Sequence, residues 1–353
     1  MMFAKPHQSA PGSWLGRLWH RLPGGGVLAL VLAGALALSL VACGGSVTRV
    51  STFKAKRLIV FGDEYSLLDD STEEGNARHY SINALDDGGS TVQCASTSQR
   101  LWVQSLADLY GLTFAECNPD GVASASINAF MRAAYGAKAQ DVYDQVVAFE
   151  EDLQGGFSSH DMATVLVGLH DVLEVFTNDD LYPTQADKEA ELTARGERVA
   201  QAVNRIAGHG TRVLVSTVAD VAYTPYAQAL GADVQARLKE MTKAFNNGLS
   251  AALLNDGTKI GLLYLNELFD TYYKSSKYEH TEMACDVDHR NHDVHAAGLV
   301  QTQGDLLNCT TATLSNGASL TTYLWADALR FNGMVIQHQL GLKARSVAAT
   351  NPF

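Results

Sequence analysis

Short apolar runs rich in β-branched residues alternate along this chain with amphipathic segments of helical period. The runs are Leu58–Phe61, Thr164–Val167, Arg212–Ser216 and Ile260–Leu265, with a weaker run at Leu112–Ala115. Between them, the segments 99–109, 190–207 and 234–252 place apolar residues three and four positions apart, which is typical of helices with one buried face. Buried strands that alternate with helices form a parallel sheet covered on both faces, with functional residues at the carboxyl ends of the strands. The pattern therefore predicts an α/β fold.

The first 42 residues have the layout of a secretory leader. Three basic residues and no acidic residue precede the apolar run Val27–Ala42, which ends in Leu-Val-Ala immediately before Cys43. This order is that of a bacterial lipoprotein signal peptide, so we expect cleavage before Cys43 and a lipid on that cysteine. The alternative is a transmembrane helix, but a run of 16 residues is shorter than the ~20 that a spanning helix needs.

We expect the chain to have three parts. These are a lipoprotein signal peptide at 1–42, a lipidated tether at 43–56 and a single domain at 57–353, which is long enough for one full core. Glycines at positions 44 and 45 favour sorting to the outer membrane. The predicted location is therefore the bacterial cell envelope, where a lipid anchor at Cys43 holds the domain to the membrane on its periplasmic or outer surface.

The charge of the chain excludes one class of partner. The net charge is −12 at pH 7, and the leader carries only cations, so the remaining chain is more acidic still. Nucleic-acid binding depends on basic surface that neutralises phosphates, so we expect no nucleic-acid partner. An acidic, well-solvated surface is the simplest interpretation.

Four cysteines remain after Cys43, and an even number in an exported chain predicts disulfides. They are Cys94, Cys117, Cys285 and Cys309. Pairing neighbours, Cys94 with Cys117 and Cys285 with Cys309, closes two loops of similar length, but the other two connectivities stay open. Two irregular stretches contain or border these cysteines. We expect residues 69–94 to be a surface excursion and residues 274–322 to be a long loop.

The run Leu58–Phe61 continues into Gly-Asp-Glu-Tyr-Ser, which resembles the first motif, Phe-Gly-Asp-Ser-Leu-Ser, of the GDSL (SGNH) hydrolases. Glu64 occupies the position of the serine. Further segments resemble later features of the family in the same order. They are Gln99–Leu112, Ala134–Ala139, Val167–Val172, Val218–Pro225, Phe245–Leu249, Tyr278–Cys285 and Tyr323–Arg330. The resemblance covers nearly all of the chain after the leader. It implies a flavodoxin-like, three-layer α/β/α sandwich with a parallel sheet of about five strands.

The departures from the family pattern fall on its chemistry. In the family, a serine attacks an ester, a histidine takes its proton, and an aspartate three residues before the histidine orients it. Here Glu64 stands at the serine position and Arg330 at the histidine position, while Asp327 is retained. The oxyanion donors of the family are a glycine amide and an asparagine, which correspond here to Gly136 and His170. Arginine stays protonated near neutral pH and cannot be a general base.

The two replacements put opposite charges at positions that face each other in the family. We therefore expect an ion pair between Glu64 and Arg330, with a bidentate geometry that suits the guanidinium and with Asp327 as a second acceptor. A helix N-terminus near Glu64 would further favour its negative charge. Such a pair would make the site a settled structural feature.

The sequence therefore predicts an envelope lipoprotein with an esterase fold whose nucleophile and base are replaced. It would be a non-catalytic pseudo-hydrolase that binds or scaffolds, with an acylated glycan or a lipid as its ligand. The alternative is an active ester hydrolase, of the esterase, lipase or glycan-deacetylase type, with rearranged catalytic residues. No cofactor is expected in either case.

Other residues could carry chemistry in place of the lost serine and histidine. Ser66 lies two residues beyond the nucleophile position, where a tight turn should point it elsewhere. His170 could act as a base oriented by Asp171, or it could fill the place of the asparagine as a hydrogen-bonding wall residue. Three histidines spaced by three could ligate a metal if they lay on a helix. They are His289, His292 and His295. No helix-start pattern precedes them, so we favour a polar loop and expect no metal site.

Overall fold

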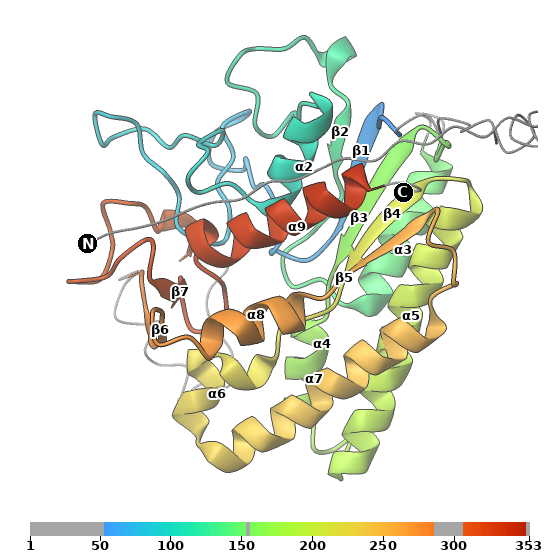
Figure 1. Ribbon diagram of the computed structural model, residues 1–353, viewed down its shortest axis with the longest axis vertical. Coiled ribbons are helices and arrows are strands. Elements are labelled where there is room, and N and C mark those ends of the chain that lie inside the picture. Colours follow the sequence, from blue (N-terminus) through green and yellow to red (C-terminus); the bar gives the residue numbers. More distant parts are fainter. Residues whose placement is uncertain (1–52, 153–155, 286–305, 351–353) are drawn as a thin grey trace, which may run out of the picture. The chain divides into compact units, whose positions relative to one another are not determined.

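The computed structural model of this chain describes residues 53–152, 156–285 and 306–350 (Figure 1). Their central element is a parallel sheet with the strand order β2-β1-β3-β4-β5. The strands are β1 Arg57–Gly62, β2 Ala129–Met131, β3 Asp161–Leu166, β4 Arg212–Ser216 and β5 Ile260–Leu263. This is the order of flavodoxin-like, doubly wound sheets. The predicted parallel sheet of five strands is therefore confirmed.

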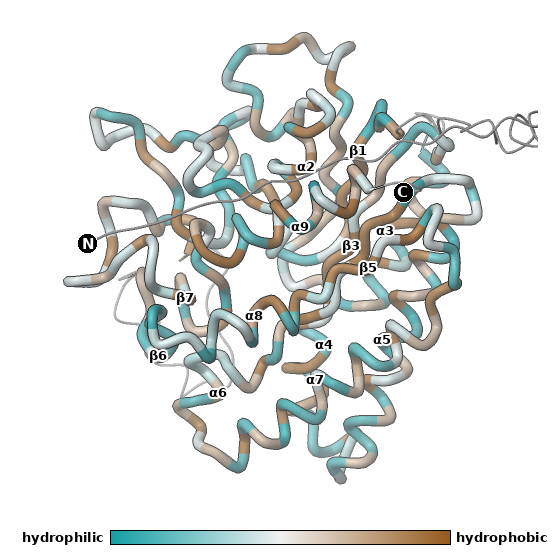
Figure 2. The backbone as a smooth tube through the Cα atoms, in the orientation of Figure 1, coloured by the Kyte–Doolittle hydropathy of each residue, from teal (hydrophilic) through white to brown (hydrophobic). Residues whose placement is uncertain are grey.

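Helices cover both faces of this sheet, which gives the three predicted layers (Figure 1). The helices are α2 Trp102–Tyr110, α3 Ala139–Glu151, α4 Leu169–Thr177, α5 Gln185–Gly208, α6 Pro225–Leu230, α7 Ala232–Ala252, α8 Leu265–Tyr273 and α9 His338–Ala349. Helices α2 and α9 pack together on one face, and α3, α5 and α7 pack side by side on the other. All of β3 and most of β1 are buried, as the continuous apolar runs of a covered parallel sheet require. Figure 2 shows the apolar character of β3 and β5 as brown stretches of the backbone.

The longest helices, α5 and α7, approach closely through glycine. A Cβ atom on Gly196 of α5 would lie 2.1 Å from the carbonyl oxygen of Phe245, and one on Gly248 of α7 would lie 2.1 Å from that of Thr193. Only hydrogen fits in either place, so the two glycines set the distance between the helices.

Three expectations about the elements need correction. The strand at the β2 edge is formed by residues 129–131, whereas in the predicted run Leu112–Ala115 only a single bridge, from Phe114 to Ala129, contacts the sheet. Residues 69–94 are not simply a surface excursion, because Tyr80 and Ile82 are buried in a second apolar cluster with both Cys285 and Cys309. The long loop expected at 274–322 contains β6 Glu279–Met283, which pairs with β7 Tyr323–Trp325.

Disulfides join neighbouring cysteines in sequence, as the first of the three possible connectivities predicts. Cys94 bonds Cys117 and Cys285 bonds Cys309, with Cα atoms 5.7 and 5.8 Å apart. The expected lipidation site Cys43, the signal peptide and most of the tether lie outside the described residues. Among the helices of the described segments, none combines the length and the apolar character needed to cross a membrane.

Candidate functional site

The residues at positions that resemble the family's catalytic motifs meet at the carboxyl edge of the sheet. Glu64 follows β1, Gly136 follows β2, and His170 lies in the first turn of α4, after β3. The chain leaves β1 for β2 on one side and returns to β3 on the other, so this edge is a topological switch point, where doubly wound folds bind ligands. The residues that follow β1 and β3 thus lie at the edge of the sheet where the sequence predicted them.

A tight turn presents Glu64 above β1. Gly62 has a φ of +135°, and a Cβ atom there would lie 2.1 Å from the carbonyl oxygen of Leu166, so only glycine lets β1 run this close to the end of β3. Asp63 Oδ1 then accepts from the amide of Tyr65 at 3.0 Å, and the carbonyl of Asp63 accepts from the amide of Ser66 at 3.0 Å. These bonds close a turn in which the Glu64 side chain faces the centre of the site.

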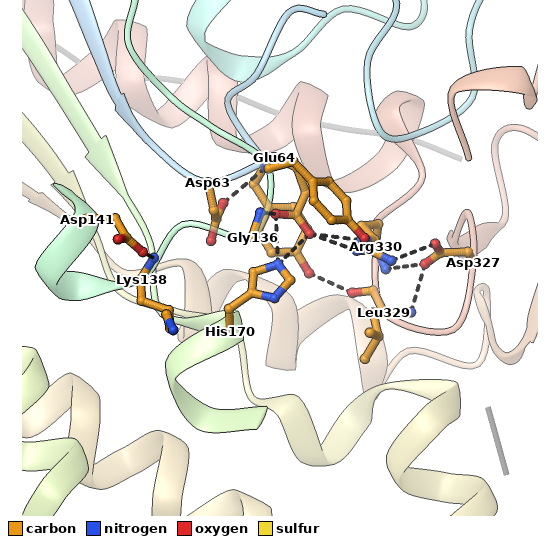
Figure 3. Close-up of polar contacts among 11 residues, drawn as sticks. Asp63, Glu64, Gly136, Lys138, Asp141, His170, Asp327, Leu329 and Arg330 are labelled. Atoms are coloured by element: carbon orange, nitrogen blue, oxygen red, sulfur yellow. Dashed lines mark hydrogen bonds and ion pairs between the residues drawn. The ribbon is translucent and has the colours of Figure 1, made fainter. Parts of the chain in front are cut away.

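The expected ion pair between Glu64 and Arg330 is confirmed. Arg330 Nε and Nη2 lie 3.0 and 2.9 Å from Glu64 Oε1, and both residues are buried. The expected bidentate geometry is wrong in one respect, because the two nitrogens converge on a single oxygen instead of gripping both. The second oxygen, Oε2, is left to other donors (Figure 3).

Gly136 and His170 supply those donors. The amide of Gly136 donates to Glu64 Oε2 at 3.1 Å, and His170 Nε2 lies 2.8 Å from both oxygens, donating in the tautomer that carries its proton there. His170 lies in the first turn of α4, so a helix N-terminus stands near Glu64 as expected, and its contact with Glu64 is made by the imidazole side chain. The two positions that correspond to oxyanion donors in the family thus hold an oxygen of the protein's own carboxylate.

The segment around Arg330 is fixed by several contacts. Asp327 accepts from Arg330 Nη1 through Oδ2 at 3.1 Å, which confirms it as a second acceptor, and its Oδ1 accepts from the amides of Leu329 and Arg330. The hydroxyl of Tyr65 donates to the carbonyl of Leu329 at 2.6 Å, and its ring stacks on Phe331 with centroids 4.4 Å apart. The turn after β1 and the segment at 327–331 are therefore held together from both ends.

Tyr135 belongs to the site, although the sequence analysis did not single it out. Its hydroxyl accepts from Arg330 Nη2 at 2.9 Å, and its ring lies 5.4 Å below the guanidinium carbon, a distance typical of a cation–π contact. The only signal in the sequence was its position directly before Gly136 in the second motif.

The surroundings keep the pair ionised. Burial acts to raise the pKa of Glu64, but the charges of His170 and Arg330 outweigh it and hold that pKa well below its usual range. Burial acts to lower the pKa of Arg330, whereas Asp327 and Glu64 hold it well above its usual range. Burial, together with the charge of Glu64, raises the pKa of Asp63 well above its usual range. Its Oδ2 finds no hydrogen-bond partner in the described part of the chain.

The structure also places the other residues that the sequence offered for chemistry. The hydroxyl of Ser66 is buried and accepts from the indole nitrogen of Trp102 at 3.1 Å, which fits the expectation that it points elsewhere. Asp171 does not orient His170, because its carboxylate accepts from the amide of Ala139 at 3.0 Å and from Arg195 at 3.3 Å. His170 instead bonds to Glu64 in the manner of a wall residue.

A metal centre finds no support among the residues that the structure describes. His289, His292 and His295 lie outside them. Across residues 53–152, 156–285 and 306–350, no group of three or more histidine, cysteine or carboxylate side chains is arranged to hold a metal ion.

Comparisons with known proteins find matches among solved structures only. No protein-family model and no curated protein matches the chain. A protein of Bacillus subtilis matches with 13% identity and a TM-score of 0.37 over 85% of this chain and 59% of its own, so this chain spans less than two thirds of it. A member of the lipolytic protein G-D-S-L family from Veillonella parvula matches with 12% identity and a TM-score of 0.35, over 63% of this chain and 85% of its own. A variant of an acetyl xylan esterase from Geobacillus stearothermophilus matches with 12% identity and a TM-score of 0.33, over 62% and 83%.

The chain's own architecture is what establishes its fold. The strand order β2-β1-β3-β4-β5, the helices on both faces and the meeting of Glu64, Gly136 and His170 at the carboxyl edge are the features that the motifs imply. By these features the chain has a GDSL/SGNH-like hydrolase fold.

Proposed function

We propose that this chain is an envelope lipoprotein whose esterase-like domain lacks the serine-hydrolase mechanism and serves as a binding or scaffolding module. The observation that carries the proposal is the buried pair of Glu64 and Arg330 at the nucleophile and base positions. A hydroxyl nucleophile needs a neighbouring base that takes its proton. Arg330 is a cation, and its pKa is held well above its usual range, so it cannot take a proton from a nucleophile.

The alternative, an active hydrolase with rearranged residues, would have to use Glu64 as a carboxylate nucleophile. Both oxygens of Glu64 accept hydrogen bonds, and its pKa is held well below the usual range. The surroundings therefore stabilise the charge of Glu64 before any reaction, and that charge would be lost on forming an acyl bond. This ground-state stabilisation opposes attack by Glu64.

The proposed ligand is an acylated glycan or a lipid, and the proposed membrane attachment is a lipid at Cys43. The leader and its Leu-Val-Ala-Cys ending support the attachment, and the net charge of −12 argues against a nucleic-acid partner. Such an anchor would place the protein in the bacterial envelope, at the outer membrane and on its periplasmic or outer surface. His170, whose side chain is 20% exposed, and the half-buried Tyr135 form the part of the centre that a ligand can touch.

An ester hydrolysis assay on the purified chain tests the inactive-module proposal. We expect no turnover of chromogenic short-chain esters above the level of the Glu64→Ala variant, and no stoichiometric labelling by a fluorophosphonate probe. Robust turnover that disappears in Glu64→Ala or His170→Ala would establish the active-hydrolase alternative. Incorporation of labelled fatty acid in cells, compared with a Cys43→Ser variant, separately tests the anchor.

A further inference from the structure

The carboxylate of Glu64 is enclosed by hydrogen-bond donors that come from three other segments of the chain. Arg330 Nε and Nη2 donate to Oε1, the amide of Gly136 donates to Oε2, and His170 Nε2 lies 2.8 Å from both oxygens (Figure 3). A guanidinium, a main-chain amide and an imidazole converging on two oxygens are the groups that recognise a carboxylate in a ligand site. Here the carboxylate belongs to the protein.

We propose that these donors form a binding site for a small carboxylate anion, which the native protein keeps filled with the side chain of Glu64. Oε2 stands where Gly136 and His170 converge, and Oε1 stands against Arg330. The side chain thus takes the place that an acetate ion would take if the site were free. The inference concerns the centre alone and does not depend on the domain being inactive towards esters.

The donors are held in place by contacts with residues other than Glu64, so the site should survive removal of the Glu64 carboxylate. Asp327 accepts from Arg330 Nη1 at 3.1 Å, and the hydroxyl of Tyr135 accepts from Nη2 at 2.9 Å. Gly136 adopts a left-handed conformation with φ of +73° in the loop after β2, and His170 belongs to the helix α4. A variant without the Glu64 carboxylate therefore retains a buried guanidinium that Asp327 and Tyr135 hold in place, and the donors that bonded Glu64 face a vacated space.

Glu64→Ala empties a space of matching size. The substitution removes Cγ, Cδ and both carboxylate oxygens, and these four atoms correspond to the four non-hydrogen atoms of acetate. A ligand this small binds only in the millimolar range even in a well-formed site, with half-saturation at about 1 mM or weaker. Acetate is therefore the probe whose size and charge fit the vacated space.

Thermal unfolding of Glu64→Ala in increasing sodium acetate, against sodium chloride of equal ionic strength, tests the proposal. We expect acetate to raise the midpoint in proportion to the logarithm of its concentration above half-saturation, by about 5 °C at ~100 mM, with a smaller effect from formate and from the bulkier butyrate and no effect from neutral acetamide. The wild type should respond to acetate no more than to chloride, because its site is filled. The isosteric Glu64→Gln variant should behave in the same way.

A double variant, Glu64→Ala with Arg330→Met, provides the control for the anion site, because it has the space without the cation. It should fail to respond to acetate. If Glu64→Ala alone is unfolded, recovery of its circular dichroism signal in acetate but not in chloride supports the site, and failure to recover in acetate overturns it. A flat response in folded Glu64→Ala, or an equal response in the wild type or the double variant, also overturns it. The ester assay on the wild type decides the proposed function separately.

Discussion

Two nitrogen atoms of Arg330, Nε and Nη2, lie 3.0 and 2.9 Å from the same oxygen of Glu64, across 266 positions of sequence. Both side chains are buried. A buried charge without its partner is far more costly than a buried pair, so the stability of the domain depends on the two residues jointly.

A double-mutant cycle measures this dependence. Glu64→Ala or Arg330→Met should each lower the free energy of unfolding by about 3–5 kcal/mol, because each breaks the buried pair and changes the charge of the buried centre by one unit. The double variant should lose less than the sum of the two, with a coupling of about 1–3 kcal/mol. Urea unfolding in acetate-free buffer gives all four values. Additive losses would show that the pair does not act as a unit.

The paired substitution Glu64→Ser with Arg330→His should restore ester hydrolysis. Asp327 would then lie three residues before a histidine, and the amide of Gly136 would be free to donate to an oxyanion. General-base assistance contributes about 10²-fold or more, so we expect at least that ratio over either single variant. A chromogenic acetate ester provides the measurement. Equal rates in all three variants would mean that the scaffold no longer positions these groups for catalysis.

Asp171 should give the domain an unusual pH dependence. Its burial raises its pKa to about 6, although Arg195 and the amide of Ala139 act to lower it. Because the folded pKa exceeds the unfolded value of about 3.9, the folded state holds more protons between these two values. The contribution of Asp171 is therefore fully present below pH ~4 and is lost as the pH rises through 6, by on the order of 3 kcal/mol.

The Asp171→Asn variant tests this dependence, because it keeps the shape and the acceptor for Ala139 but does not titrate. Unfolding free energies of the wild type and the variant, measured from pH 4 to 7, should converge at low pH and separate at high pH, with the variant more stable. A difference that is constant over this range would contradict the shifted pKa.

Glycine substitutions should distinguish close packing from helix propensity within α5. Gly196→Ala places a Cβ atom 2.1 Å from the carbonyl oxygen of Phe245, so the helices must separate, and we expect a loss of about 1–3 kcal/mol or more. Gly208→Ala, in the same helix, meets nothing within 4 Å. It should be neutral or stabilising by up to about 1 kcal/mol. Thermal unfolding of the two variants gives the comparison, and equal effects would contradict the close contact of α5 and α7.

The parts of the fold that the sequence predicted are those with continuous apolar runs. β1 and β3 lie inside the sheet, where both faces are covered, so their hydrophobic residues follow one another without interruption. β2 has only three residues, of which Phe130 and Met131 are partly exposed, and so short a segment has no period to detect. Residues 69–94 read as a polar loop because they are rich in Asp, Gly, Ser and Asn. Their burial depends on segments far away in the sequence: Asn83, for example, donates to the carbonyl of His79 and to that of Cys309, 226 positions away.

The motif positions identified the residues at the centre, but they did not predict the geometry of the contacts among these residues. The ion pair of Glu64 and Arg330 follows from two charges at facing positions of a known site. Alongside the convergence of Arg330 on one oxygen, the amide of Gly136 donates to the other and His170 lies 2.8 Å from both, and these residues come from the loop after β2 and from helix α4. The contact of Tyr135 with Arg330 joins residues 195 positions apart. No local pattern encodes contacts of this kind, because they are set by how the loops pack.

The convergence of Arg330 on Glu64 also bears on how such a centre can diverge. Replacing either residue alone changes the balance of charge in the interior by one unit, while replacing both with neutral residues leaves that balance unchanged. Descendants of this chain should therefore retain the two residues together or lose them together. A sequence with only one of them should carry a compensating charge change within reach of Asp327 or His170.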